Sequence, residues 1–333
     1  MLLLIAFACA PAPELKPEPD PVTDTDVDTD ATSTYIPPTG PTGDEETADT
    51  APFVIPTTDV DCAALTPLPV ATTTLAWVTG SEDFAFDGAG NELGVSGGAL
   101  FRTPFGGPRA LVIPGLSDSI RGMRVLADGT IAAADPEHQT IVGGDPDTGA
   151  SWVIAAGVTN PNGIAIGVDG WIYAALTGSI VRVDPTNGTT ETVVALPGKS
   201  FDGLTFSPDY QRLHFNEEIG RIWTVDVDPA GGWTEPVEGP DLPLGGFSIL
   251  DGMTADACGN VYIVEMGGTV WRVTPAGVVE IAVTVPGLAV ISAVNFGSGI
   301  GGFDRETLYI MDFIGKLYAA DMGVPGKWEP YLP

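Results

Sequence analysis

The chain has few basic residues and no long apolar run, and each shortage excludes a class of protein. Its 333 residues include 13 Lys and Arg against 44 Asp and Glu, which gives a formal net charge of −31. A surface this negative repels phosphate backbones, so we expect no binding to nucleic acid. No apolar run reaches the roughly 20 residues that a membrane-spanning helix needs.

Two further patterns are missing from the sequence. Between the short apolar runs of the central part, no stretch of helix length has a 3.6-residue apolar period, which argues against a helical fold. No Ser or Cys stands in a nucleophile-elbow pattern, so covalent catalysis has no candidate residue.

The chain does have an internal repeat, with starts roughly 39 to 49 residues apart. Between Glu82 and Phe296, six polar openings are each followed by short apolar runs separated by Gly- or Asp-rich turns. Such a period is typical of β-propeller blades. We therefore predict an all-β, six-bladed β-propeller of four-stranded blades over residues 62–333. The openings are Glu82-Asp83, Arg121-Gly122, Asn162-Gly163, Asp202-Gly203, Asp251-Gly252 and Ala293-Val294-Asn295.

The two ends of the repeat predict how the ring of blades closes. The last blade shows three strands, near residues 293–296, 307–311 and 316–320, and has no clear fourth. The run from Thr73 to Val78 precedes the first blade and has strand composition. We expect this N-terminal strand to complete the last blade, so that no blade is left with a strand missing.

Polar residues open several inner strands at the same phase of the repeat. In a propeller these strands begin at one face and bring their first residues together around the central channel. Carboxylate and carboxamide oxygens gathered there would suit a hard cation such as calcium. The alternative is that each Asx-Gly pair is ordinary turn chemistry. The residues expected at the metal site are Glu82, Asp83, Asn162, Asp202 and Asp251.

Three strings in the repeat resemble the signatures of a known family. Residues 201–209 read FDGLTFSPD and residues 250–256 read LDGMTAD, which look like blade signatures of the senescence marker protein/gluconolactonase/luciferin-regenerating enzyme family. Residues 80–84 read GSEDF, similar to the opening of the paraoxonase branch of the same superfamily. The resemblance covers most of the chain after the N-terminal segment and implies the propeller fold.

The resemblance also implies a function and a role for each opening residue. Since members of the family are calcium-dependent lactonases, we expect a metal-dependent hydrolase of a lactone or related ester. One divalent cation, expected to be calcium, would polarise the carbonyl while a carboxylate activates water. Asp251 is the expected base and Asp135 the second candidate. The family pattern places metal ligands at Glu82, Asp202 and Asp251, and the paraoxonase pattern adds Asn162 and Asp83.

Two positions depart from the family pattern. Gluconolactonase-type enzymes have a substrate-contacting Asn at the start of the second blade, where this chain has Arg121. Paraoxonases have a catalytic His at the end of the second strand of that blade, where this chain has Asp135, with His138 three residues further on. We expect Arg121 either to orient the substrate or to pair with carboxylates, and His138 to contact the substrate. His214 falls inside a strand and is expected to be structural.

A second hypothesis is a non-catalytic, surface-tethered propeller that binds a partner or ligand, with any metal only structural. Acidic residues at the ends of second strands would suit a charged recognition rim as well as an active-site wall. These residues are Glu217, Glu218, Glu265 and Asp312. Hydrolysis of lactones distinguishes the two hypotheses.

The first 61 residues predict an exported protein that is anchored to a membrane. Residues 1–9 are apolar and end at Cys9, which resembles the end of a bacterial lipoprotein signal, so we expect lipid on Cys9. Residues 10–61 hold thirteen acidic residues against Lys16 alone, with many Pro and Thr. Such a segment is expected to be a disordered, self-repelling spacer. We expect a monomer in the bacterial cell envelope.

If Cys9 carries lipid, two cysteines remain. Two cysteines in an exported domain suggest one disulfide. We therefore expect Cys62 to bond Cys258, which would join the start of the propeller to a turn of the fifth blade.

Overall fold

A computed structural model of the chain describes residues 55–56, 59–77, 82–227, 232–245, 248–287 and 289–332. All of these residues belong to one compact unit, Ala51–Pro333. Cys9 and almost all of the predicted spacer, residues 10–61, lie outside the described residues. Within the described part of the chain, no helix combines the length and apolar character needed to cross a membrane.

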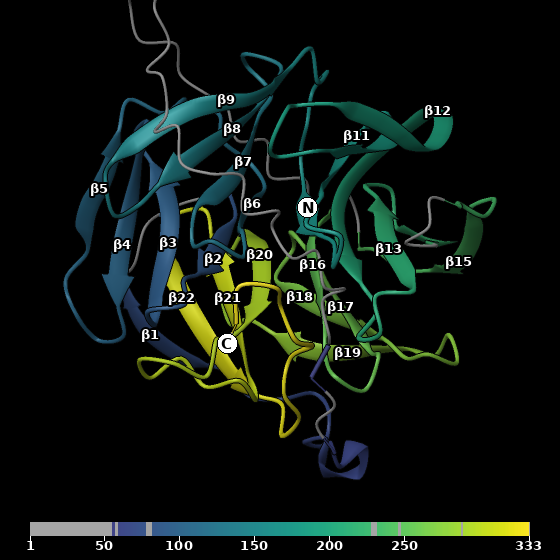
Figure 1. Cartoon of the computed structure of the whole chain (residues 1–333). Coiled ribbons are helices and arrows are strands. Elements are labelled where there is room, and N and C mark those ends of the chain that lie inside the picture. Colours follow the sequence, from purple (N-terminus) through teal and green to yellow (C-terminus); the bar gives the residue numbers. More distant parts are fainter. Residues whose placement is uncertain are drawn as a thin grey trace, which may run out of the picture. The chain divides into compact units, whose positions relative to one another are not determined.

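The folded unit is all-β, as predicted, and its antiparallel sheets surround a common centre (Figure 1). Apart from the short 3-10 helix η1 (Cys62–Ala64), the described elements are strands. Two sheets precede the middle of the chain: β2 (Phe84–Phe86), β3 (Asn91–Ser96), β4 (Ala99–Pro104) and β5 (Ala110–Pro114), then β6 (Met123–Val125), β7 (Ile131–Asp135), β8 (Thr140–Asp145) and β9 (Ala150–Ala156). Two follow it: β16 (Leu250–Ala255), β17 (Val261–Glu265), β18 (Thr269–Val273) and β19 (Val279–Thr284), then β20 (Ile291–Phe296), β21 (Thr307–Asp312) and β22 (Lys316–Asp321) with β1 (Thr73–Trp77).

The prediction of six four-stranded blades is wrong, because the described strands form five sheets. The fifth sheet has six strands and covers the segment predicted as the third and fourth blades. Its strands are β10 (Ile164–Ile166), β11 (Ile172–Val183), β12 (Thr190–Phe206), β13 (Arg212–Glu217), β14 (Arg221–Asp226) and β15 (Val237–Asp241).

The long strand β12 explains the difference. The expected break between the third and fourth blades falls within β12, which continues through Pro197 and Gly198 although Gly198 has a left-handed φ of 86°. Thr177 of β11 pairs with Ser200, so the hairpin continues past the point where the sequence predicts its end. As a result, the last strand of one predicted blade runs directly into the first strand of the next.

Each sheet packs against two neighbours, and the core lies between them. All five residues of β7 and all five of β17 are buried, because these second strands are covered on both faces. Their apolar, β-branched or small residues match that position. The outer strand β9 is mostly exposed. Around the channel, neighbouring inner segments follow one another as β2, β6, β10, the end of β12, β16 and β20.

The predicted closure by the N-terminal strand is confirmed. β1 pairs antiparallel with β22, with Thr73 opposite Ala319 and Thr74 opposite Tyr318. Val78, the last residue of the predicted strand, lies outside the described residues. Because β1 is hydrogen-bonded to β22, that edge of β22 is not left unpaired.

A second closure comes from the C-terminal segment and was not predicted. Lys327 N donates to Ala255 O (3.0 Å), and its Nζ donates to the hydroxyl of Tyr210 (3.0 Å). That hydroxyl donates in turn to Trp328 O (2.8 Å). Four residues of this segment line a small cavity with the far ends of β2, β16 and β20: Lys327, Glu329, Tyr331 and Leu332. The segment therefore covers the end of the channel opposite the strand openings.

The predicted disulfide is confirmed. Cys62 of η1 is bonded to Cys258, which lies 196 residues further on in the turn after β16. The bond fixes the entering chain to the β16–β19 sheet.

Candidate functional site

The predicted opening residues meet at one end of the channel. Their side chains and the glycines that follow them line a cavity of about 10 Å³. That is roughly the space of one water molecule. With the side chains in these positions the cavity admits a water molecule or an ion but not a lactone. The predicted residues that line it are Glu82, Asp83, Arg121, Asn162, Asp202 and Asp251.

Two β-bulges place the central aspartates. The pairing of β12 with β13 changes register between Phe201 and Leu204, and that of β16 with β17 changes between Leu250 and Met253. A bulge adds one residue to a strand and re-aims its side chain. Asp202, the first residue of the β12 bulge, and its counterpart Asp251 in β16 therefore face the channel, although both lie inside strands.

The glycine after each opening residue is required by close approach of neighbouring inner strands. A Cβ at Gly163 would lie 2.2 Å from Asp202 O, and one at Gly203 would lie 2.6 Å from Asp251 O. Neither glycine has a left-handed φ. Gly163 N donates to Asp202 O (3.1 Å), so the strands are also hydrogen-bonded there. The turn interpretation of Asx-Gly does not hold at these positions.

We expect Gly163→Ala to destabilise the fold by roughly 1–3 kcal/mol, because its new methyl group would push against the backbone that carries Asp202. The matched control is Gly88→Ala, where the nearest atom to the new methyl group is Tyr331 O at 3.5 Å. Urea unfolding of both variants measures the difference. Equal stabilities for the two variants would contradict the close-approach explanation.

Burial, and then the charges of neighbouring carboxylates, raise the pKa values of Asp202 and Asp251 at the cavity. Burial, followed by the charges of Glu82 and Glu218, raises the pKa of Asp202 to about 8. Burial and then the charge of Asp202 raise the pKa of Asp251 well above its usual range. The hydrogen bond between the two aspartates lowers the pKa of Asp202 and raises that of Asp251, but burial leaves both pKa values raised. Burial also raises the pKa of Glu82 to about 7, against the opposing effect of Arg121.

Asn162 and Asp83 have different surroundings. The side chain of Asn162 is buried at the cavity and makes no hydrogen bond to another described residue. Asp83 accepts hydrogen bonds from Phe84 N (2.8 Å), Met123 N (3.0 Å) and Arg124 Nη1 (2.5 Å). The oxygens of Asp83 are therefore used within the fold, whereas the amide of Asn162 is available to a ligand.

Asp135 and His138 form a pair that does not line the cavity. His138 Nδ1 lies 2.8 Å from Asp135 Oδ2, with Asp135 buried and the His138 side chain 63% exposed. The hydrogen bond to Asp135 raises the pKa of His138. Arg121 does line the cavity, and its Nε lies 3.7 Å from Glu82 Oε1. Arg121 N donates to Ala134 O, so the pair stands beside Arg121 at the same end of the channel.

Ser292 is a cavity residue that the sequence analysis missed. β20 begins at Ile291 and has a register shift between Ile291 and Ala293, like the bulges that carry the two aspartates. Ser292 is fully buried and lines the cavity. The predicted opening of this unit, residues 293–295, was placed one residue too late. The signal was the string ISAVNF, which aligns with LDGMTA of β16.

The acidic residues at second-strand ends are mostly bonded within the fold. Glu217, Glu265 and Asp312 are buried and bind a lysine, an indole N–H and a backbone N–H, respectively. Glu218 differs, because it is half-buried and its charge contributes to the raised pKa of Asp202. A free acidic recognition rim is therefore not formed by the first three.

The donor atoms at the cavity are carboxylate and amide oxygens, which are of the types that bind a hard cation. Among the described residues, no group of three or more His, Cys, Asp or Glu side chains is spaced as a metal site. The buried pair Asp202 and Asp251, whose pKa values are both raised, instead lies beside the amide of Asn162 and the carboxyl of Glu82. Oxygen donors of these types are the ligands that calcium prefers. When both carboxyls lose their protons, the two buried carboxylates need a cation to offset their repulsion.

Part of the chain matches a family model. Residues 173–312 match the family described as SMP-30/Gluconolactonase/LRE-like region. This match includes the strings at 201–209 and 250–256, so the predicted resemblance is confirmed. A search of curated proteins finds no match.

Solved structures with related names share the fold. Regucalcin, a calcium-binding protein from Agrobacterium tumefaciens, has a TM-score of 0.65 and 18% identity, over 79% of this chain and 98% of that chain. A gluconolactonase from Xanthomonas campestris has a TM-score of 0.61 and 19% identity, over 77% and 89%. A luciferin-regenerating enzyme has a TM-score of 0.64 and 14% identity, over 78% and 98%. At these identities the likeness shows the fold alone.

Proposed function

We propose that this protein is a metal-dependent hydrolase of a lactone or related ester. The observation that carries the proposal is the buried pair of Asp202 and Asp251 at the channel mouth, with Asn162 and Glu82 beside it. Support comes from the SMP-30/gluconolactonase/LRE-like region, which contains both aspartates. A gluconolactonase and a calcium-binding regucalcin are also among the proteins with this fold.

The proposed ligands of one divalent cation are Glu82, Asn162, Asp202 and Asp251, and their oxygen donors favour calcium. Asp83 is left out of this set because Arg124 and two backbone N–H groups already bind it. When bound, the cation would polarise the carbonyl of the substrate and stabilise the oxyanion.

The other steps are assigned to side chains of the chain itself. Once deprotonated, Asp251 is the base that takes a proton from the attacking water. Asp202 accepts the hydrogen bond of Asp251 and so orients it. Arg121 stands at the rim, where its guanidinium contacts a substrate oxygen. His138, held by Asp135, contacts the substrate further out.

Since the cavity holds only about one water molecule, the substrate binds above it, at the channel mouth. The C-terminal segment covers the opposite end of the channel. Substrate is therefore proposed to enter and leave at the face that carries Glu82 and Arg121.

We also propose that the protein acts outside the cytoplasm, held at a membrane by lipid on Cys9. The disulfide between Cys62 and Cys258 supports an oxidising compartment. Fractionation of cells that express wild type and Cys9→Ser tests this. Membrane-bound wild type and a released variant are expected, and equal release of both contradicts the anchor.

The function is tested with a panel of lactones and aryl esters, assayed after chelation and again after calcium is restored. Calcium-dependent hydrolysis of at least one lactone is expected. If the wild type hydrolyses none of the compounds while calcium still raises its melting temperature, the protein is a binding module with a structural metal.

The stability of the metal-free protein is expected to fall as pH rises. The folded-state pKa of Asp202 is about 8, above an unfolded value of about 3.9. A raised pKa contributes stability that is fully present below the unfolded value and is lost as pH rises through the folded value. With chelator present, the free energy of unfolding should fall by more than about 1 kcal/mol from pH 5 to pH 8.

Asp202→Asn is the control for this pH dependence, since it keeps the shape of the side chain and removes its titration. We expect a smaller decline for this variant, and we expect calcium to stabilise the wild type most at the high end of the range. A wild type whose stability is flat across the range would contradict the raised pKa of the buried Asp202.

A further inference from the structure

A larger pocket lies at the other end of the strands. It has a volume of about 450 Å³ and lies between strands β13–β15 and the β16–β19 sheet. Its wall includes the turn at Ser207, which follows the last residue of β12, Phe206. At about 3.3 Å per residue, Phe206 is roughly 13 Å along β12 from Asp202. The pocket is thus separate from the cavity that Asp202 and Asp251 line. Its volume is in the range of small-molecule sites.

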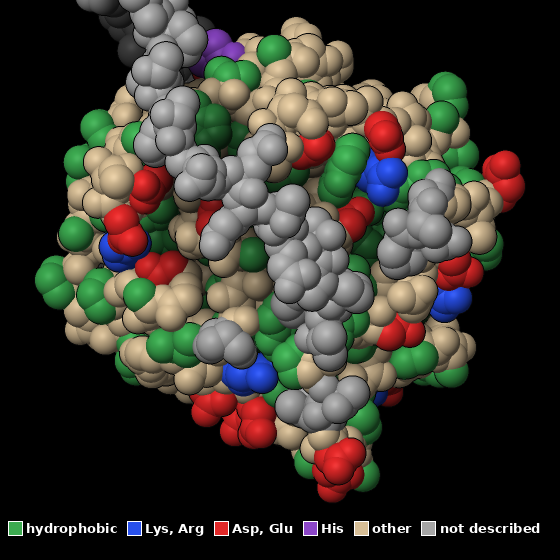
Figure 2. Space-filling view, in the orientation of Figure 1, with side chains coloured by type: hydrophobic (Ala, Val, Ile, Leu, Met, Phe, Trp, Pro, Cys, Tyr) green, Lys and Arg blue, Asp and Glu red, His purple; other side chains and the backbone are tan. Residues whose placement is uncertain are grey.

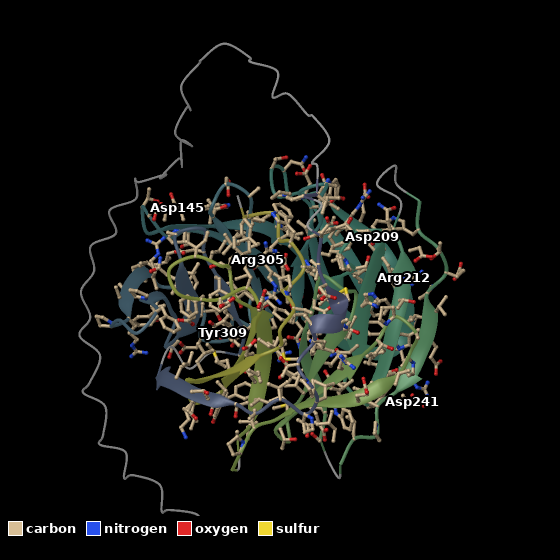
Figure 3. The ribbon with its side chains drawn as sticks, turned by 90° about the horizontal axis from the view of Figure 1, so that it is seen from below. Asp145, Asp209, Arg212, Asp241, Arg305 and Tyr309 are labelled. Atoms are coloured by element: carbon tan, nitrogen blue, oxygen red, sulfur yellow. A yellow bond between two sulfur atoms is a disulfide. The ribbon has the colours of Figure 1, made fainter. Side chains whose placement is uncertain are left out.

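One wall of the pocket is polar where an interface between sheets is normally apolar. Arg212 and His214 of β13 stand opposite Asp226 and Thr224 of β14, and all four line the pocket. The alternate residues of both strands, such as Leu213, pack in the hydrophobic core on the other face. Asp209 and Arg212 lie near each other at one edge of the sheets (Figure 3).

A corresponding pocket elsewhere shows that the fold does not require this polarity. A pocket of about 300 Å³ lies between the β6–β9 sheet and β10. Its lining is mainly apolar, with Leu126, Trp152 and Ile166, and Asp128 is the titratable residue among the residues that line it. The polar wall with His214 is therefore a property of this sequence at one interface.

His214 supplies hydrogen-bonding groups that the described fold does not use. Its ring makes no hydrogen bond to another described residue. Burial, and then the charge of Arg212, lowers the pKa of His214 to about 4, so the ring is neutral at pH 7. A neutral imidazole has one donor and one acceptor nitrogen. Beside it, Thr224 adds a hydroxyl that both donates and accepts.

The charges around the pocket select against anions. Asp209 and Asp226 face a single Arg212, which is already paired with Asp226 (Nε to Oδ1, 2.7 Å). Acidic side chains also outnumber basic ones over the face shown in Figure 2, and the whole chain carries −31. The opposite wall is apolar, with Val261, Val273 and Pro275.

We infer that this pocket is a second binding site, for an uncharged small molecule with several hydroxyl groups and one apolar face, such as a neutral sugar or polyol. The donor and acceptor of His214 and the hydroxyl of Thr224 bind its hydroxyl groups. The apolar wall covers its C–H face. This site is independent of the proposed hydrolase site.

Histidine NMR tests the proposal directly, because the chain has 2 histidines and the other, His138, is exposed. The neutral probes are D-glucose, N-acetyl-D-glucosamine and myo-inositol, and D-glucuronate is the matched anion. At least one neutral probe should shift the ring signals of His214 saturably, with a Kd tighter than about 1 mM. The signals of His138 should stay unchanged, and D-glucuronate should bind at least about tenfold more weakly.

Thr224→Val is the test variant, because it keeps the shape of the side chain and removes the hydroxyl. We expect it to weaken binding by about tenfold, which is the effect of losing one hydrogen bond. Asp147→Asn, in an exposed turn, is the control and should bind like the wild type. No shift of His214 with any neutral probe, equal shifts of both histidines, or unchanged binding by Thr224→Val would each overturn the inference.

Discussion

Asp251→Asn is expected to lower kcat/KM for lactone hydrolysis by about 10²–10⁴-fold, the contribution typical of a positioned general base. Asn keeps the size of the side chain and its capacity for a hydrogen bond with Asp202, but it cannot take a proton from water. The pH at which activity rises should also change, because the wild-type base has a raised pKa. Steady-state kinetics over a range of pH with saturating calcium measures both effects.

Two comparison variants separate this role from a general loss of charge. Asp241→Asn removes a carboxylate whose side chain is 70% exposed and pairs with Arg221, so full activity is expected. Asp135→Asn should have a smaller effect than Asp251→Asn, because Asp135 lies outside the cavity and acts through His138. If Asp251→Asn retains full activity, Asp251 is not the base.

Cys62→Ser should lower the free energy of unfolding by about 5 kcal/mol, since the disulfide closes a loop of 196 residues. In the chain-entropy model, closing so long a loop removes much of the freedom of the unfolded chain. Urea unfolding of wild type, Cys62→Ser and Cys258→Ser, each with and without reductant, measures the effect.

Both variants should match the reduced wild type, and reductant should not change either variant. Wild-type stability that is the same with and without reductant would show that the bond does not stabilise the protein.

The period of the repeat was enough to predict the strands and the closing partner of β22, but not the number of sheets. Polar openings and β-branched runs mark where strands begin and what they bury. Pro197 and Gly198 look like a break in sequence, and Gly198 has a left-handed φ, yet β12 continues beyond them because Ser200 pairs with Thr177. Such pairing depends on partners that local sequence does not reveal.

The C-terminal closure was hidden for a different reason. Lys327 looks like a surface residue in the sequence, because lysine is almost never fully buried unless it is paired. In the structure it is buried, and it contacts the hydroxyl of Tyr210 and the carboxylate of Glu329. Tyr210 lies more than a hundred residues earlier in the chain, and nothing local links the two.

The positions of the site residues could be predicted from their place in the repeat. Their ion pairs and hydrogen bonds could not. Asp202 and Asp251 meet because equivalent positions of neighbouring inner strands meet at the channel. The ion pair between Arg124 and Asp83 could not be predicted in this way, because Arg124 comes from the next inner strand. Ser292 was missed because a serine followed by alanine lacks the acidic residue and glycine that marked the other openings.

Calcium binding followed by isothermal calorimetry tests the central claim most directly, with chelator-treated wild type, Asp202→Asn and Asp241→Asn compared at the same pH. We predict one site in the wild type, uptake of calcium with release of protons, at least tenfold weaker binding by Asp202→Asn, and wild-type binding by Asp241→Asn. Absence of saturable binding to the wild type, or equal affinity in Asp202→Asn, would contradict a cation site built on the buried aspartate pair.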